Sequence, residues 1–254
     1  MSKKLDFGLG ALKAPDDPLD FEYGVAMATI MQAELPSWID NREYCTPVWN
    51  QGQEGSCVGM AIAGAAEFLY WKKLGARPGF SPRAAYEWAK EYDHIPGVDH
   101  EGSTMRAGLK AWQKMGMCPW PRWPYVDGDP GGKDVEAERR ARGYPLWRYE
   151  KLDNDANIIF QMRHAIHKQG LVLVTLKVHT GWIDPHADGK IRYQSNYKFY
   201  GYHAAMLVAN YHRSGYFWLR NSWDLWGVDG YGQIGYDDIE NNLVDAWVPM
   251  IKMD

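Results

Sequence analysis

The chain has 254 residues, a length that suits one large domain or two compact lobes that share a cleft. Hydrophobic residues make up 46% and charged residues 24%, which excludes a chain that is disordered throughout. The formal net charge of −4 without a basic stripe argues against nucleic acid as a partner, and no apolar run suits a signal peptide or a membrane span. By default we expect a cytoplasmic location or a place in a virion.

Residues 1–34 are interrupted by glycine and proline, and we expect an N-terminal extension there, an arm or a short propeptide. The segment from Val25 to Leu35 predicts a short helix inside this extension. We expect the extension to pack on the surface or to cover a groove. Residues 35–254 are then predicted to form the main domain.

The first half of the main domain is predicted to be helical. A polar, glycine-rich turn at 51–56 precedes a helix from Val58 to Lys73, where apolar residues keep a period of 3.6 and Gly75 follows as a stop. The other elements expected here are an extended piece at 46–49, a helix at 84–92 started by Ser81 and Pro82, a loop at 95–103, a helix at 104–114 stopped by Gly116, and a non-helical run at 119–125.

The second half predicts strands after one amphipathic helix. The expected elements are that helix at 158–166, ended by Gly170, then strands at 171–178, 204–211 and 216–221, with a hairpin turn at 212–215. The layout predicts an α+β fold with a helical lobe over about 50–126. A β-rich lobe would comprise about 127–254 with 35–49, and the site would lie in the cleft between the lobes.

Three cysteines are present, Cys45, Cys57 and Cys118, and so small and odd a number argues against a disulfide framework. Only Cys57 lies at a predicted helix N-terminus, where unpaired N–H groups lower a thiol pKa. Cys57 is therefore the candidate nucleophile, and the other two are expected to serve packing. The amide of Gln51, across the turn, and the backbone N–H of Cys57 would make an oxyanion hole.

His203 begins one strand of the predicted hairpin and Asn221 ends its partner. Because paired strands lie about 5 Å apart, the two side chains can meet at the open end of the hairpin. Asn221 would then orient the imidazole, which acts as the base, and the ring of Trp223 would shield their hydrogen bond from water.

These segments together resemble the papain/cathepsin family of cysteine peptidases, in particular bacterial and phage members without a long propeptide. The nucleophile segment is 51–57, the histidine segment 203–205 and the asparagine segment 221–232; Leu35-Pro36 resembles the start of the mature domain. His203 follows Cys57 by 146 residues, within the roughly 130–150 typical of this family, and Asn221 follows it by 164. The resemblance implies a two-lobe fold whose second lobe is an antiparallel, barrel-like sheet, and peptide-bond hydrolysis through an acyl-enzyme without a cofactor.

The chain departs from the family at several positions. The family signature C-G-[SA]-C-[WY] has Glu54 in place of its first cysteine and Val58 in place of its aromatic residue. His100 stands where the resemblance places that cysteine's disulfide partner. Asp224 replaces a usual glycine.

The resemblance also implies a set of substrate-binding residues. Gly102 and Ser103 resemble the strip that pairs with the substrate backbone. Thr104, Met105 and Ala205 would line the main side-chain pocket, which would favour an apolar side chain, and Trp223 would border the cleft.

The remaining histidines predict no metal site. His164 and His167 share a helix face without a third ligand, and His94, His100, His179 and His186 are expected in exposed loops. Two alternatives to a peptidase stay open: an amidase or transferase with the same thiol chemistry, and a structural or binding component of a larger particle such as a phage. The expected partner is a peptide or protein substrate.

Overall fold

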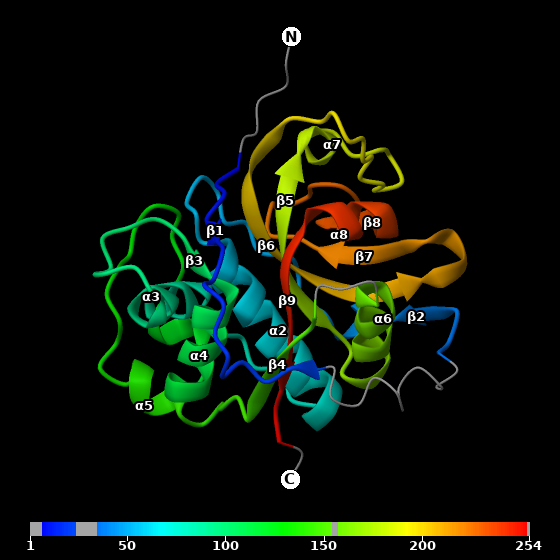
Figure 1. Ribbon diagram of the computed structural model, residues 1–254. Coiled ribbons are helices and arrows are strands. Elements are labelled where there is room, and N and C mark those ends of the chain that lie inside the picture. Colours follow the sequence, from blue (N-terminus) through cyan, green and yellow to red (C-terminus); the bar gives the residue numbers. More distant parts are fainter. Residues whose placement is uncertain (1–6, 24–34, 154–156, 253–254) are drawn as a thin grey trace.

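The computed structural model describes residues 7–23, 35–153 and 157–252. It is an α+β protein, as predicted, with one group of helices on one side and the sheet, with further helices packed on it, on the other (Figure 1). The helix predicted at 25–35 lies almost wholly outside the described residues. No helix among the described residues is long and apolar enough to cross a membrane.

The helical half is built around α2 (Cys57–Leu74), which begins at the candidate nucleophile and ends at Gly75 with φ 66°. Ser81 accepts a hydrogen bond from the Ala84 N–H and so caps the next helix. The other helices of this half are α3 (Pro82–Tyr92), α4 (Met105–Met115), α5 (Ala137–Ala141) and the 3-10 turns η2 (Arg42–Tyr44) and η3 (Trp120–Arg122). Residues 57–70 of α2 are buried on every side, because α3, α4 and the sheet enclose this helix. The sequence predicted this helix but not that it would be enclosed on every side.

Seven strands of the described residues form one antiparallel sheet in the order β4-β9-β5-β6-β7-β8, with β2 also paired to β6. Their bounds are β2 (Trp38–Asp40), β4 (Arg148–Lys151), β5 (Val172–His179), β6 (Phe199–Tyr211), β7 (Tyr216–Arg220), β8 (Tyr231–Gly235) and β9 (Leu243–Met250). The hairpin predicted at 204–221 is present, with its turn in η4 (His212–Ser214). Since β4 and β8 are not paired with each other in the described chain, the sheet is open and does not close into a barrel.

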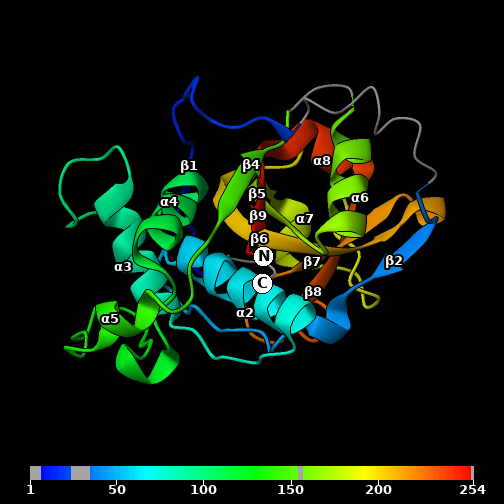
Figure 2. The ribbon, with the colours of Figure 1, turned by 90° about the horizontal axis from the view of Figure 1, so that it is seen from below.

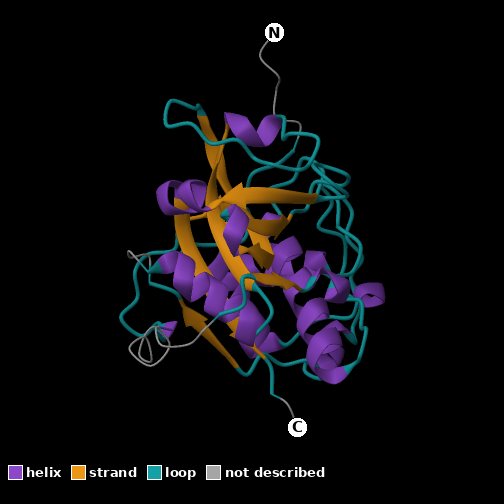
Figure 3. Ribbon diagram, turned by 90° about the vertical axis from the view of Figure 1, so that its right-hand side faces the viewer, coloured by secondary structure: helices purple, strands orange, loops and turns teal. Residues whose placement is uncertain are grey.

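Each face of the sheet has its own hydrophobic core. Leu173 of β5 points toward α2, whereas its neighbour Val174 points to the opposite face. That second face is covered by α6 (Ile158–Lys168) and α8 (Tyr236–Asn242), with α7 (Thr180–Ile183) at its edge (Figure 2). The strands lie between the two groups of helices (Figure 3).

The segment after residue 126 stays with the helical half. Ala137 and Ala141 of α5 pack against Ala84 and Trp88. The crossing to the sheet therefore takes place at β4, about twenty residues later than the predicted lobe boundary.

The N-terminal strap, residues 7–23, crosses both halves. Its strand β1 (Ala11–Leu12) pairs in parallel with β3 (Ser103–Thr104), and Glu22 then bridges to Lys151 of β4. In Figure 1 the blue strap runs down beside α4 and then across β4. The strap thus lies over the junction of the helices and the sheet, where the candidate site is.

Candidate active site

Cys57 is the first residue of α2 and is fully buried. Its Sγ atom accepts a hydrogen bond of 3.5 Å from the Ala204 N–H of β6. Burial raises the pKa of the Cys57 thiol, while backbone N–H groups of Ala204, Gly10 and Val58 act in the opposite direction. The helix N-terminus was expected to lower this pKa, but in the strapped state the loss of water outweighs the N–H groups.

His203 meets Asn221 as predicted for the open end of the hairpin. Its Nε2 atom donates to Asn221 Oδ1 over 2.7 Å, and the same oxygen accepts from the Ser222 N–H over 2.8 Å. The His203 Nδ1 atom has no hydrogen-bond partner among the described residues. Trp223 lies 4.4 Å from the imidazole between ring centroids and is itself fully buried. The imidazole is therefore held by Asn221 with Nδ1 left to receive a proton.

Burial lowers the pKa of His203 to about 4, although its hydrogen bond to Asn221 acts to raise it. The pKa in the unfolded chain is about 6.5, so the unfolded state binds more protons between these values. The stability of the native chain relative to a His203→Gln variant should therefore be full above pH 6.5 and fall by about 3 kcal/mol as the pH drops to 4. Urea unfolding of both proteins at pH 7 and pH 4.5 measures the difference. If the free energies of unfolding of the two proteins differ by the same amount at both pH values, the His203 imidazole is not buried and neutral as described.

Gln51 is fixed by groups from both halves of the chain. Its side-chain oxygen accepts from Ser222 Oγ over 2.6 Å, and its backbone N–H donates to the Ser222 carbonyl over 3.0 Å. Its Nε2 donates to the carbonyl oxygens of Glu54, over 2.8 Å, and Gly8, over 3.1 Å. Sequence reasoning missed Ser222 as the residue that orients Gln51, although Ser222 directly follows Asn221.

The strap runs through the site and forms hydrogen bonds with its polar groups. The Gly8 carbonyl lies on Gln51 Nε2, and the Ser103 N–H donates to the Gly10 carbonyl over 2.9 Å. Phe7 stacks on Trp223 with ring centroids 5.2 Å apart. A Cβ atom at Gly10 would lie 1.8 Å from the Gly55 carbonyl oxygen, so only glycine fits at this close approach.

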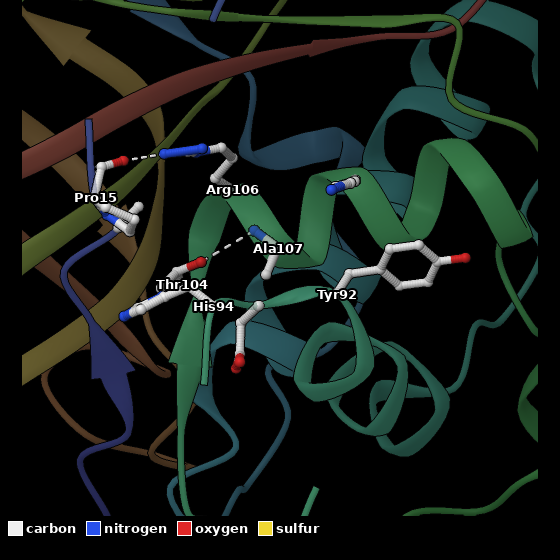
Figure 4. A pocket seen from close by; sticks show the side chains of 9 residues that line it. Pro15, Tyr92, His94, Thr104, Arg106 and Ala107 are labelled. Atoms are coloured by element: carbon white, nitrogen blue, oxygen red, sulfur yellow. Dashed lines mark hydrogen bonds between the residues drawn. The ribbon is translucent and has the colours of Figure 1, made fainter. Parts of the chain in front are cut away.

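Ion pairs anchor the strap beyond the site. Arg106, at the start of α4, pairs with Asp17 at 2.9 Å and lies 3.6 Å from Asp20. It also donates to the Pro15 carbonyl (Figure 4). On the sheet side, the Lys151 N–H donates to the Phe21 carbonyl over 2.8 Å. The strap is thus held both by the helical half and by the sheet.

The proposed substrate strip lies beside the strap. Gly102 has φ 89°, and its N–H donates to Tyr86 Oη over 2.8 Å. The backbone N–H of Ser103 donates to the strap, whereas the Ser103 hydroxyl donates to the Asp93 carboxylate. Thr104 uses its hydroxyl to cap α4. The Ser103 N–H is therefore the donor of this strip that the strap occupies.

The structure places Ala205 away from the cleft, in the core under α6 and α8, so it does not line the pocket. Ala204 faces the other way and packs in the same cluster as Ala11, Cys57 and Met105. The reason is the period of two along a strand, in which a shift of one residue changes the face. Met105 remains on the cleft side.

The predicted exposure is wrong for His179 and only partly right for His100. His179 ends β5, is 4% exposed, and its Nε2 contacts Asp238 of α8 at 2.9 Å. His94 and His186 are exposed and His100 is half-buried against Asp93. Among the described residues no group of three or more His, Cys, Asp or Glu side chains could hold a metal ion.

A buried ion pair supports the turn before Cys57. Arg83 is fully buried, and its two terminal nitrogens contact the Glu54 carboxylate at 2.6 and 2.7 Å. Glu54 stands at the position of the missing family cysteine. The carboxylate of Asp127 accepts from the N–H groups of Gln53 and Glu54. Ionic and backbone contacts thus fix the turn that a disulfide would fix elsewhere in the family.

Replacing Arg83 with methionine should lower the free energy of unfolding by about 3–5 kcal/mol, because Glu54 then loses its buried counterion. The matched control is Arg139→Met, which removes an exposed pair with Glu136 and should cost about 1 kcal/mol or less. Denaturant titration of both variants gives the comparison. Equal losses would mean that the Glu54 pair contributes no more than a surface contact.

Comparison with known proteins agrees with this geometry. A family model described as papain family cysteine protease matches residues 35–246. A cysteine protease of Blomia tropicalis is 27% identical over 252 residues, covering 94% of this chain and 71% of that protein. Cathepsin J of Mus musculus is 28% identical over 221 residues, and the alignment spans 80% of this chain but only 61% of cathepsin J. Among solved structures, Xylellain, a cysteine protease from Xylella fastidiosa, superposes with a TM-score of 0.83 at 25% identity over 99% of each chain.

Proposed function

Since this chain belongs to the papain family of cysteine proteases, we propose that Cys57 is the nucleophile with which it cuts peptide bonds. His203 is the acid and base, and Asn221 orients its imidazole. Gln51 and the Cys57 backbone N–H donate to the oxyanion. The substrate is a peptide or protein chain that lies along Gly102 and Ser103, with Trp223 bordering the cleft.

The reaction follows from these roles. The Cys57 thiol passes its proton to Nδ1 of His203, the ring nitrogen that Asn221 does not occupy. The thiolate adds to the carbonyl carbon, and the resulting oxyanion receives hydrogen bonds from Gln51 and the Cys57 N–H. The C–N bond then breaks as His203 protonates the leaving amine. Water, deprotonated by His203, releases the acid product from the thioester and restores the thiol.

The contact between the Gly8 carbonyl and Gln51 is the observation that most supports the proposal. In the strapped chain a backbone carbonyl, that of Gly8, already accepts a hydrogen bond from Gln51 Nε2. A peptide carbonyl therefore fits at the proposed oxyanion donor, beside the start of α2. The same contact makes the strapped chain a latent form, because the donor and Ser103 are already engaged.

The test is replacement of Cys57 by alanine. In a chain whose strap is displaced by Gly10→Val, this replacement should lower peptide hydrolysis to the background rate. The native chain should form one adduct with a peptidyl epoxide, on Cys57 and not on Cys45 or Cys118. The adduct is located by mass spectrometry of peptides. Hydrolysis that survives in the Cys57→Ala variant would overturn the assignment.

An amidase or transferase would use the same residues with another substrate or acceptor. The family matches favour peptide hydrolysis over this alternative and over a non-catalytic component of a particle. Release of a free carboxylate from an unstructured peptide, followed in the presence and absence of an added amine, distinguishes hydrolysis from transfer.

A further inference from the structure

His179 is a buried histidine that the catalytic proposal does not use. It ends β5 and is 4% exposed. Its Nδ1 atom accepts a hydrogen bond of 3.1 Å from the Gly181 N–H, so the ring proton is on Nε2, which donates to the Asp238 carboxylate over 2.9 Å. Asp238 is fully buried on α8, and Asn242 donates to its other oxygen over 2.8 Å. Both ring nitrogens of His179 therefore make hydrogen bonds, one to α7 and one to α8.

The contact with Gly181 makes His179 the N-terminal cap of α7. This helix has four residues, too few to be stable through its own hydrogen bonds, so its position depends on the contacts around it. A Cβ atom at Gly181 would lie 1.8 Å from the Arg192 carbonyl oxygen and 3.0 Å from Cε1 of His179, so the backbone of α7 packs directly against the histidine ring. The rings of Tyr193 and Tyr197 lie 5.4 and 5.7 Å from the same ring, between centroids. His179 thus fixes where α7 begins.

The helix α7 holds a tryptophan against the catalytic histidine. Trp182 is fully buried, and its ring lies 6.1 Å from the His203 imidazole and 5.9 Å from Trp223, between centroids. Trp226 stacks on Trp182 at 5.7 Å, and its indole N–H donates to the Trp182 carbonyl over 2.7 Å. Among the described residues, Trp182 and Trp223 are the aromatic rings beside His203. The position of α7 therefore decides how closely Trp182 covers the imidazole.

The cover over His203 affects both its charge and its orientation. Burial is the main influence on its pKa, which it lowers to about 4, and the hydrogen bond with Asn221 acts in the opposite direction. If the imidazole loses part of its cover, water reaches it and favours the charged form, so the pKa moves back toward 6.5. A less closely packed ring is also held less firmly in the orientation that proton transfer needs. The pKa of His203 therefore reports whether Trp182 is in place.

We propose that His179 is a positioning residue for the catalytic histidine: held by Asp238, it fixes α7 so that the tryptophan of this helix covers and orients the imidazole. His179 acts through α7 and not by contact with the substrate. The inference rests on the proposed function in that His203 is the acid and base of the reaction. The contacts that position His203 are present in the strapped chain and can be tested there without catalysis.

The first experiment follows the His203 imidazole by NMR in the native, strapped chain, over a pH range that spans its buried and its ordinary pKa. His179→Leu keeps most of the bulk but makes neither hydrogen bond, and it should raise the pKa of His203 from about 4 to about 5 or higher. His179→Asn retains an acceptor for the Gly181 N–H and should keep the pKa near the native value. The double variant His179→Leu, Asp238→Leu leaves no buried charge without a partner, so it should fold and show the same rise as His179→Leu.

The matched control is Ile166→Ala, on α6 in the hydrophobic core that also contains Trp182. It should destabilise the fold by leaving a cavity and should keep the pKa of His203 at about 4. A pKa that stays at about 4 in the folded double variant would overturn the positioning role. An equal rise in Ile166→Ala would overturn it as well, because any loosening of this core would then act as His179→Leu does.

Kinetics separate this inference from the proposed function. In the Gly10→Val chain, His179→Leu should lower kcat about tenfold or more with little change in KM, because the orientation of the imidazole affects the chemical steps and not the binding of substrate. Ile166→Ala should leave kcat at the value of the Gly10→Val chain. A pKa of His203 that depends on His179, in a chain that hydrolyses no peptide, would support the positioning role and overturn the proposed function. Peptide hydrolysis that depends on Cys57, with the pKa of His203 and kcat unchanged in His179→Leu, would overturn the positioning role and leave the proposed function in place.

Discussion

Replacing Gly10 with valine should raise the rate at which a peptidyl epoxide alkylates Cys57 in the full-length chain by about a hundredfold. The Cβ atom would lie 1.8 Å from the Gly55 carbonyl oxygen, a backbone atom and not the end of a flexible side chain. Overpacking of this kind costs about 1–3 kcal/mol, and 2.7 kcal/mol corresponds to a factor of about one hundred in strap occupancy. The strap then leaves Gln51 and Ser103, and the peptidase activity should rise in parallel with the alkylation.

The control is Gly132→Val, at a glycine where a Cβ atom would meet nothing within 4 Å. It should leave the alkylation rate at the native value. Mass spectrometry after timed exposure to the inhibitor follows the adduct on Cys57 in each protein. A Gly10→Val chain that folds but reacts no faster than the native chain would show that the strap does not limit access to the thiol.

We expect the strapped state and an open state to differ in the ionisation of Cys57 and His203. With the strap in place, burial raises the thiol pKa of Cys57 and lowers the imidazole pKa of His203, so both groups are held neutral. Displacing the strap admits water, and the N-terminus of α2 can then favour the thiolate as the sequence predicted. The predicted thiolate therefore belongs to the open state, and the structure describes the closed one.

Much of the candidate site was predictable because it depends on local signals. A glycine-rich turn followed by a helix positions Cys57, and a hairpin of known turn brings His203 to Asn221. These arrangements depend on residues close in sequence or on one strand pairing. The same holds for the cap at Ser81, which fixed the start of α3.

The predictions that were wrong concern features set by contacts between residues far apart in the sequence. The path of the strap depends on the hydrogen bond between Gly10 and Ser103, more than ninety residues away, and no local pattern encodes that contact. The exchange of Ala205 for Ala204 came from a one-residue uncertainty in which face of β6 turns to the cleft. The burial of His179 needs α8, which lies almost sixty residues further along the chain.

Replacing Gln51 with alanine in the Gly10→Val chain should lower kcat by about 10²–10³ while KM changes little, because the lost amide acts on the oxyanion, which exists only in the transition state. Ser222→Ala should have a smaller effect of the same kind. Ser222 does not touch the oxyanion but holds the Gln51 side-chain oxygen at 2.6 Å, and so keeps Nε2 directed into the site. It is therefore a positioning residue.

Steady-state kinetics on one peptide separate the two roles. Gln51→Glu keeps the shape but replaces the donor with an acceptor, so it should be as impaired as Gln51→Ala, whereas Ser222→Thr retains a hydroxyl and should recover most of the rate lost in Ser222→Ala. A loss in Gln51→Ala that appears in KM alone would mean that this amide binds the ground state and the transition state equally, and would remove Gln51 from the oxyanion hole. If Ser222→Thr restores the rate but not the free energy of unfolding lost in Ser222→Ala, that result would show that the hydroxyl acts on catalysis through Gln51. A purely structural role of Ser222 would restore the rate and the stability together.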